Sequence, residues 1–206
     1  ALTVGTIVHE RIEKYLTCKY ITHSSFEMDY DEIEMMYRAQ VFNALESFKL
    51  WEQHLEVCGC RITKIIGIEV PLFCPWFGGT ADIIFEINGA VYIGDFKTSK
   101  AISPDYLIQA AAYMWIVNNG YAPNIPHVNG IGIIRVDKNN VKFNDLFLND
   151  FIQDQHIYIA RLQEAFGSYL NSYYRTMNTN YLFDQYNSNY DSDKYFKYDI
   201  KENKNE

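Results

Sequence analysis

The stretch Gly79–Lys97 reads GTADIIFEINGAVYIGDFK, and it decides the fold of the residues around it. Two apolar runs flank Asn88-Gly89, a dipeptide that favours a two-residue β-hairpin turn. With that turn, Asp82 falls opposite Asp95 at a non-hydrogen-bonded position, where Cα atoms lie about 4.5 Å apart. Like charges directly opposite each other destabilise a sheet, so a chain with this register either tolerates the cost or binds a cation between the two carboxylates.

The same hairpin carries a lysine that suits phosphodiester chemistry. Side chains alternate between the faces of a strand, which places Lys97 on the face of Asp95. Hydrolysis of a phosphodiester uses a metal that polarises the phosphoryl oxygen and activates water, and Mg²⁺ takes carboxylate ligands. Asp82 and Asp95 are therefore candidate metal ligands, and Lys97 is a candidate to orient the attacking water or stabilise the transition state. The alternative is a surface hairpin with an ordinary ion pair.

The length and composition predict a single globular domain. Of the 206 residues, 48% are apolar, enough for a sizeable core. The sequence has no long apolar run and no signal peptide, so we expect a soluble, intracellular protein without a membrane partner, in the cytoplasm or a phage-infected host, with an organelle left open. The net charge of −8 argues against a broad nucleic-acid-binding surface but leaves room for a local basic groove.

Hydrophobic periodicity predicts four helices and five strands along the chain. The predicted helices are Val4–Tyr20, Glu32–Val57, Ser103–Asn118 and Asp150–Tyr174. The predicted strands are Arg61–Phe73, Ala81–Ile87, Ala90–Phe96, Val128–Val136 and Val141–Leu148. This order predicts an α/β fold with a mixed central β-sheet flanked by helices, in which the third helix crosses over to a parallel strand.

Local signals set the expected ends of these elements. Capping residues are expected at the helix N-termini: Thr3 or Thr6, then Asp31, then Ser103. The first strand would end at Pro71 or Pro75, because proline interrupts the ladder. We expect one domain over residues 1–183 and a polar tail rich in Tyr and Asn over 184–206, in which Tyr195–Ile200 could add an edge strand.

Further candidate residues lie on the helices and on the first strand. His9 and Glu13, four residues apart, share a face of the first predicted helix, and His9 is a candidate metal ligand. Gln109 and Tyr113 have the same spacing on the helix after the hairpin, where they could contact a phosphate or a base. Glu69 could supply a third carboxylate. Each of these residues also fits an ordinary structural role.

Taken in order, these residues resemble the motif set of the RecB-type branch of the PD-(D/E)XK nuclease superfamily. That family has G-x-x-x-H-x-x-x-E on an N-terminal helix, G-x-x-D and D/E-x-K on strands, and Q-x-x-x-Y on a following helix. The matching residues here are Gly5, His9 and Glu13, Gly79 and Asp82, Asp95 and Lys97, and Gln109 and Tyr113. The ordered set is far more specific than any one of its motifs.

The resemblance implies a restriction-endonuclease-like core and a nuclease that uses one or two Mg²⁺ or Mn²⁺ ions. The implied metal ligands are His9, Asp82, Asp95 and the backbone carbonyl of Phe96, with Glu13 and Glu69 as additional candidates. Lys97 would be the catalytic lysine, and Gln109 and Tyr113 would complete the site. The implied substrate is DNA, as ends or single strands, cut by an exonuclease in recombination, repair or replication.

The sequence departs from parts of that family in two ways. The four cysteines lack zinc spacing and none follows Cys74, so the iron–sulfur cluster of some members is not expected. No P-loop motif occurs, so a helicase, recombinase or single-strand-binding partner would be a separate chain. Two alternatives stay open: a DNA-binding or assembly subunit that keeps the nuclease scaffold without turnover, and a metal-dependent hydrolase of small phosphate esters.

Overall fold

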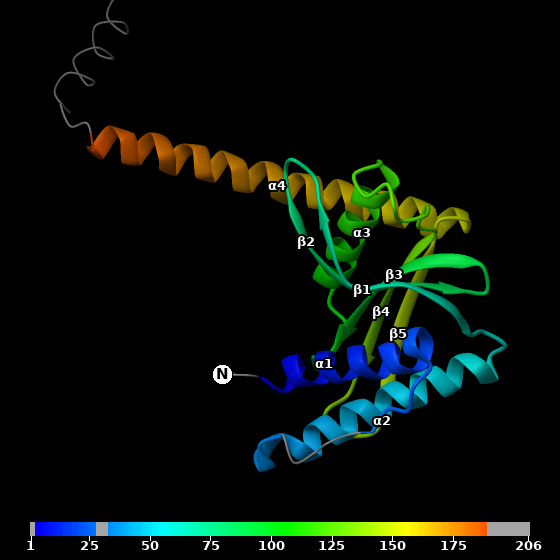
Figure 1. Cartoon of the computed structure of the whole chain (residues 1–206). Coiled ribbons are helices and arrows are strands. Elements are labelled where there is room, and N and C mark those ends of the chain that lie inside the picture. The colour runs from blue at the N-terminus through cyan, green and yellow to red at the C-terminus, as the bar shows by residue number, and fades with distance from the viewer. Residues whose placement is uncertain (1–2, 28–32, 189–206) are drawn as a thin grey trace, which may run out of the picture. The chain divides into compact units, whose positions relative to one another are not determined.

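The computed structural model of the chain describes residues 3–27 and 33–188 and contains a five-stranded sheet with helices on both faces (Figure 1). The chain divides into two compact units, Ala1–Gln163 and Glu164–Glu206. The helical elements are α1 (Val4–Leu16), the π-helical turn η1 (Thr17–Thr22), α2 (Met35–Val57), α3 (Pro104–Asn118) and α4 (Gln153–Ser188). The strands are β1 (Ile62–Phe73), β2 (Gly78–Ile87), β3 (Ala90–Lys97), β4 (Gly130–Val136) and β5 (Phe143–Asn149). Among the described helices, none combines the length and apolar character needed to span a bilayer.

The sheet confirms the predicted α/β class and the mixed pairing. Its strand order is β1-β2-β3-β4-β5, so each strand lies beside its neighbours in sequence. Only the β3–β4 pair is parallel, and α3 makes the crossover between those two strands. A parallel pair requires such a crossover, since a tight turn joins only antiparallel strands.

The β2–β3 hairpin has the predicted register. Its pairs run from Ile87–Ala90 to Ile83–Gly94 without a shift. Asn88 and Gly89 have φ values of 49° and 88°, and this pair of positive φ values is what a type I′ turn requires. The paired ladder ends at Ile83–Gly94, one position before the two aspartates.

Two apolar cores pack against the two faces of the sheet. Helices α1 and α2 cover one face, where Val8, Phe48 and Phe85 are buried. Helix α3 covers the other face, where Ile93 and Ile116 are buried, and the first turns of α4 add to the same core. The crossover helix is therefore held against the strands that carry the candidate site.

Several helix boundaries agree with the predictions and others differ. Thr3 caps α1 and Ser103 caps α3, each by accepting a hydrogen bond from a backbone N–H. Helix α2 begins at Met35 rather than at residue 32, and Asp31 lies outside the described residues. The first helix is α-helical only to Leu16 and continues as the π-helical η1.

The end of the first strand agrees with the prediction, and the end of the last helix differs from it. β1 passes through Pro71 and ends at Phe73, before Pro75, and an edge strand tolerates a proline within it. Helix α4 continues past Tyr174 to Ser188, so the expected boundary at residue 183 falls within a helix. The expected tail strand, Tyr195–Ile200, lies outside the described residues.

Candidate metal centre

The site lies where the β2–β3 ladder ends, and a side chain replaces a ladder bond there. The Phe96 N–H donates a hydrogen bond of 2.7 Å to Asp82 Oδ2. The Asp82 side chain is 15% exposed, so one carboxylate oxygen is fixed by the backbone of β3 in a largely dry environment. This contact fixes the orientation of the Asp82 carboxylate.

Helix α1 brings His9 to the same carboxylate. His9 Nδ1 lies 3.6 Å from Asp82 Oδ2, and the imidazole meets the Phe96 ring edge-on. A Cβ at Gly5 would lie 3.2 Å from Thr98 Oγ1, so a glycine lets this turn of α1 approach the end of β3 closely. Burial, and then the Lys97 ammonium, lower the pKa of His9, which favours the neutral imidazole that binds metals.

Glu69 completes a group of three side chains that could hold a metal ion. His9, Glu69 and Asp82 each offer one ligand atom, and the three atoms lie within 4.8 Å of one another. Glu69 stands on β1 between the Ile68–Ile83 and Val70–Ala81 pairs, and its φ is 49°. A non-glycine residue in this conformation stores strain, and such strain concentrates at functional sites.

Asp95 and Lys97 form a closed pair beside this group. Lys97 Nζ lies 2.8 Å from Asp95 Oδ1 and 2.7 Å from Oδ2, and it also lies over the ring of Tyr106. Burial, and then the neighbouring Asp82 carboxylate, raise the pKa of Asp95 to about 6 although Lys97 opposes the shift. Asp82 is therefore close enough to Asp95 to raise its pKa, while both Asp95 oxygens contact Lys97.

The group of possible metal ligands therefore differs from the predicted one, in which Asp82 and Asp95 face each other. Asp82 gathers with His9 and Glu69, whereas Asp95 is engaged by Lys97. Glu13 lies near enough to help raise the pKa of Glu69, after burial and Asp82. The roles of Asp95, Glu13 and the Phe96 carbonyl as metal ligands stay predictions.

Helix α3 contributes a tyrosine that fits against the start of β2. Gln109 Nε2 donates a hydrogen bond of 3.3 Å to Tyr113 Oη. A Cβ built on Gly79 would lie 2.1 Å from that hydroxyl oxygen, so only glycine leaves room for it. Burial raises the pKa of Tyr113, so the phenol keeps its proton and can donate to a phosphate oxygen.

We expect Gly79→Ala to destabilise the protein by about 1–3 kcal/mol, the usual cost of overpacking. The added methyl group collides with Tyr113 in the wild-type background. Urea denaturation of Gly79→Ala, Tyr113→Ala and the double variant measures the coupling between the two positions. The alanine at position 79 should cost much less once the tyrosine is gone. Equal costs in both backgrounds would refute this steric explanation.

Burial and neighbouring charge disfavour the ionised forms of the carboxylates at this site. Burial is the largest cause that raises the pKa of Asp82, Asp95 and Glu69, and the Asp82 charge adds to the shift of the other two. Two carboxylates with a neutral imidazole also form a donor set that suits a divalent ion. The residues present therefore fit Mn²⁺ or Mg²⁺.

We expect Asp82→Asn to raise the Tm of the metal-free protein at neutral pH by about 2–4 °C, for about 1 kcal/mol. A carboxyl whose pKa is higher in the folded than in the unfolded state destabilises the fold when ionised. The increase in Tm from Asp82→Asn should therefore be complete at pH values above the pKa of Asp82 in the folded protein and absent below its usual value of 3.8. Melting curves in EDTA at about pH 7 and pH 3.5 test this. A lower Tm at neutral pH would contradict it.

The sequence patterns did not reveal Tyr106, whose ring lies 4.8 Å from Lys97 Nζ. Tyr106 precedes Gln109 by three residues and Tyr113 by seven, so all three share one face of α3. This spacing is visible in the sequence and could have indicated that Tyr106 lies on the same face as Gln109 and Tyr113. This face of α3 therefore lies toward the end of β3 that carries Asp95 and Lys97.

A scan against protein-family models finds no match to this chain, and no curated protein matches it.

Proposed function

We propose that the chain is a divalent-metal-dependent deoxyribonuclease that hydrolyses DNA phosphodiester bonds as an exonuclease on DNA ends or single strands. The observation that carries the proposal is the convergence of His9, Glu69 and Asp82 beside the Asp95–Lys97 pair. The order of the four motifs along the chain supports the same chemistry. Recombination, repair or replication is the proposed setting.

Each part of the site has a proposed role. A bound Mg²⁺ or Mn²⁺ would polarise the phosphoryl oxygen and lower the pKa of a bound water. His9 and Asp82 would hold the ion, with Glu69, Asp95 and the Phe96 carbonyl as further ligands. Lys97 would orient the attacking water and offset the charge that develops on the phosphoryl group. Tyr113 and Gln109 would position the DNA backbone.

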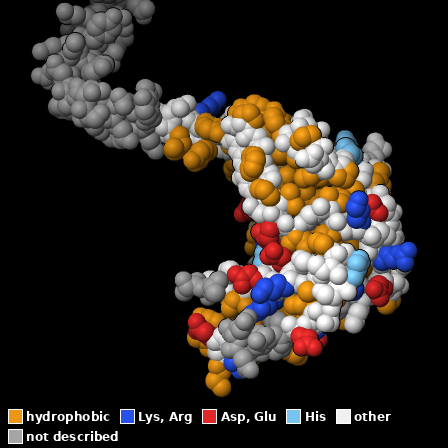
Figure 2. Space-filling model, in the orientation of Figure 1, with side chains coloured by type: hydrophobic (Ala, Val, Ile, Leu, Met, Phe, Trp, Pro, Cys, Tyr) orange, Lys and Arg blue, Asp and Glu red, His pale blue; other side chains and the backbone are white. Residues whose placement is uncertain are grey.

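The charge distribution supports a confined DNA path rather than a broad binding surface. On the face shown in Figure 2, acidic and basic side chains are interspersed. The net charge of −8 opposes non-specific coating of DNA, because phosphate binding depends on Lys and Arg. A separate helicase, recombinase or single-strand-binding protein would then deliver the strand.

Digestion of end-labelled DNA tests this proposal. We expect the wild-type protein to cut linear single- or double-stranded DNA in millimolar Mn²⁺ or Mg²⁺ and to stop on addition of EDTA. A closed circular single strand distinguishes an exonuclease from an endonuclease, because an exonuclease needs a strand end and leaves the circle intact. Absence of cleavage on every substrate would refute the proposal. Metal-independent binding without cleavage would then favour a DNA-binding subunit, and turnover of a chromogenic phosphodiester alone would favour a small-ester hydrolase.

A further inference from the structure

A pocket of about 430 Å³ lies between the loop after β3 and the turn between β4 and β5. Its lining consists of residues 98–100, 135, 137–140 and 142. Four basic side chains and one carboxylate line it, in a chain whose net charge is −8. Its basic residues are Lys100, Arg135, Lys138 and Lys142. Positive charge is therefore concentrated at this place.

Arg135 connects the two segments that line the pocket and also contacts strand β5. Its Nε donates to the Ser99 carbonyl at 2.7 Å, its Nη1 to Asn144 Oδ1 at 2.9 Å and its Nη2 to Asp137 Oδ2 at 2.7 Å. Arg135 and Asp137 are 5% and 4% exposed. This buried pair neutralises the pocket's one carboxylate, so the lysines supply the net charge.

The turn between β4 and β5 is also preorganised. Asp137 Oδ1 accepts hydrogen bonds from the N–H groups of Asn139 and Asn140. The buried Ser47 of α2 accepts the Lys142 N–H at 2.9 Å and so ties the turn to the core. A rigid pocket loses little conformational entropy when a ligand binds.

The pocket adjoins the candidate metal centre. Arg135 is the partner of Lys97 in the parallel β3–β4 register, and strands in a sheet lie about 4.8 Å apart. Thr98, Ser99 and Lys100 follow Lys97 directly in the chain. Within the described part of the chain, Lys100 and Lys138 make no ion pair, while Lys142 lies 3.5 Å from Asp137. Both of the unpaired ammonium groups are available to an anion.

We propose that this pocket binds a phosphate group of the DNA strand next to the phosphate that is cut, with Lys100 and Lys138 as its main contacts. The assignment of DNA as the ligand rests on the proposed nuclease function. The pocket would fix the strand beside the metal centre, and a lysine contact with phosphate carries no sequence preference.

Fluorescence anisotropy with a labelled single-stranded oligonucleotide in EDTA tests the pocket apart from the metal site. We expect Lys100→Ala and Lys138→Ala each to weaken binding by about 3- to 10-fold and to lower the salt slope by about 1. Lys138→Arg should retain binding, and Lys64→Ala on β1 should match the wild type. Melting curves confirm that each variant is folded.

The phosphate that the pocket binds could be internal to the strand or at its 5′ end, and oligonucleotides with and without a 5′-phosphate distinguish the two. An equal loss on both assigns the pocket to an internal phosphate, and a loss confined to the phosphorylated strand assigns it to a strand end. If both lysine variants bind DNA with wild-type affinity and salt slope, the proposal that this pocket binds a DNA phosphate is wrong, even if the wild type cuts DNA. Binding that depends on the lysines but occurs without cleavage would support phosphate binding by the pocket and refute the proposed nuclease function. If the wild-type protein does not bind DNA at all, the proposal that the pocket binds a DNA phosphate is also wrong.

Discussion

Lys97→Ala is expected to lower the rate of metal-dependent DNA cleavage by about 10²–10³-fold, the usual cost of removing one group that stabilises a transition state. Lys97 is the cation of the site, and its ammonium contacts both oxygens of Asp95. Single-turnover cleavage of end-labelled DNA in Mn²⁺ measures the chemical step without product release.

The same variant separates catalysis from metal binding. Because the ammonium competes with a metal ion for Asp95, Lys97→Ala should bind Mn²⁺ at least as tightly as the wild type. Lys64→Ala removes an exposed lysine of β1 and should cleave normally. Cleavage by Lys97→Ala at the wild-type rate would show that this lysine has no catalytic role, and a loss of Mn²⁺ affinity would assign it to the metal site instead.

Mn²⁺ is expected to stabilise the wild-type protein and to have no such effect on Asp82→Asn. A ligand at one hundred times its Kd adds about 2.7 kcal/mol to the folded state, or roughly 5–10 °C in Tm. Asp82 shares the candidate group with His9 and Glu69, and one ligand atom of each lies within 4.8 Å of the others. Its amide replacement carries no charge, so the gain from Mn²⁺ and DNA cleavage should both disappear.

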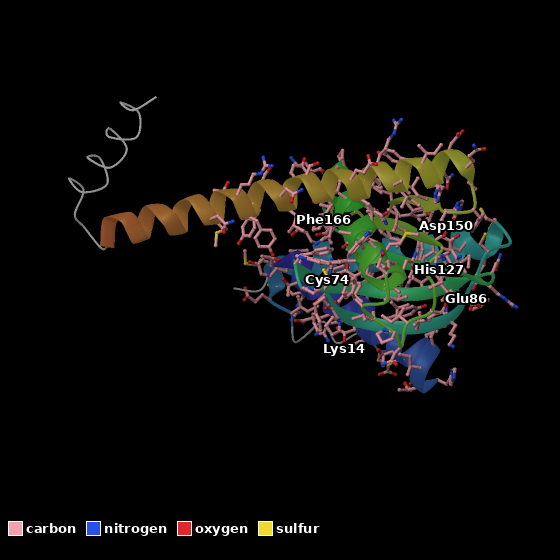
Figure 3. The ribbon with its side chains drawn as sticks, turned by 90° about the horizontal axis from the view of Figure 1, so that it is seen from above. Lys14, Cys74, Glu86, His127, Asp150 and Phe166 are labelled. Atoms are coloured by element: carbon pink, nitrogen blue, oxygen red, sulfur yellow. The ribbon has the colours of Figure 1, made fainter. Side chains whose placement is uncertain are left out.

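Glu86→Gln is the matched control for this substitution. Glu86, which is labelled in Figure 3, is on the same strand but next to the hairpin turn. Its carboxylate accepts a hydrogen bond from Thr63. This variant should keep the full Mn²⁺-dependent shift in Tm. A shift that survives in Asp82→Asn would place the metal elsewhere.

The parts of the fold that local signals specify could be predicted from the sequence. Asn88-Gly89 sets the hairpin register because its two residues adopt the positive φ that the turn needs. Ser103 and Pro104 set the start of α3 in the same local way. The mixed sheet then follows, since a hairpin and a crossover helix leave few arrangements.

The arrangement within the site could not be predicted, because it depends on contacts between distant segments. Hairpin register placed Asp82 near Asp95, but the edge strand β1 brings Glu69 to Asp82 through a left-handed residue that no pattern indicates. The closed Asp95–Lys97 pair also involves a distant segment, because Lys97 lies over the ring of Tyr106 on α3. The position of the Arg135 side chain likewise depends on hydrogen bonds to Ser99, Asn144 and Asp137, two of which lie outside its own strand and the turn after it.

Anomalous diffraction from crystals soaked in millimolar Mn²⁺ tests the central claim most directly. We expect a strong peak within about 2.0–2.3 Å of His9 and Asp82, with Glu69 or Asp95 as a further ligand. A Mn²⁺ ion bound there would place a Lewis acid beside Lys97. Absence of anomalous density at these side chains would contradict the account.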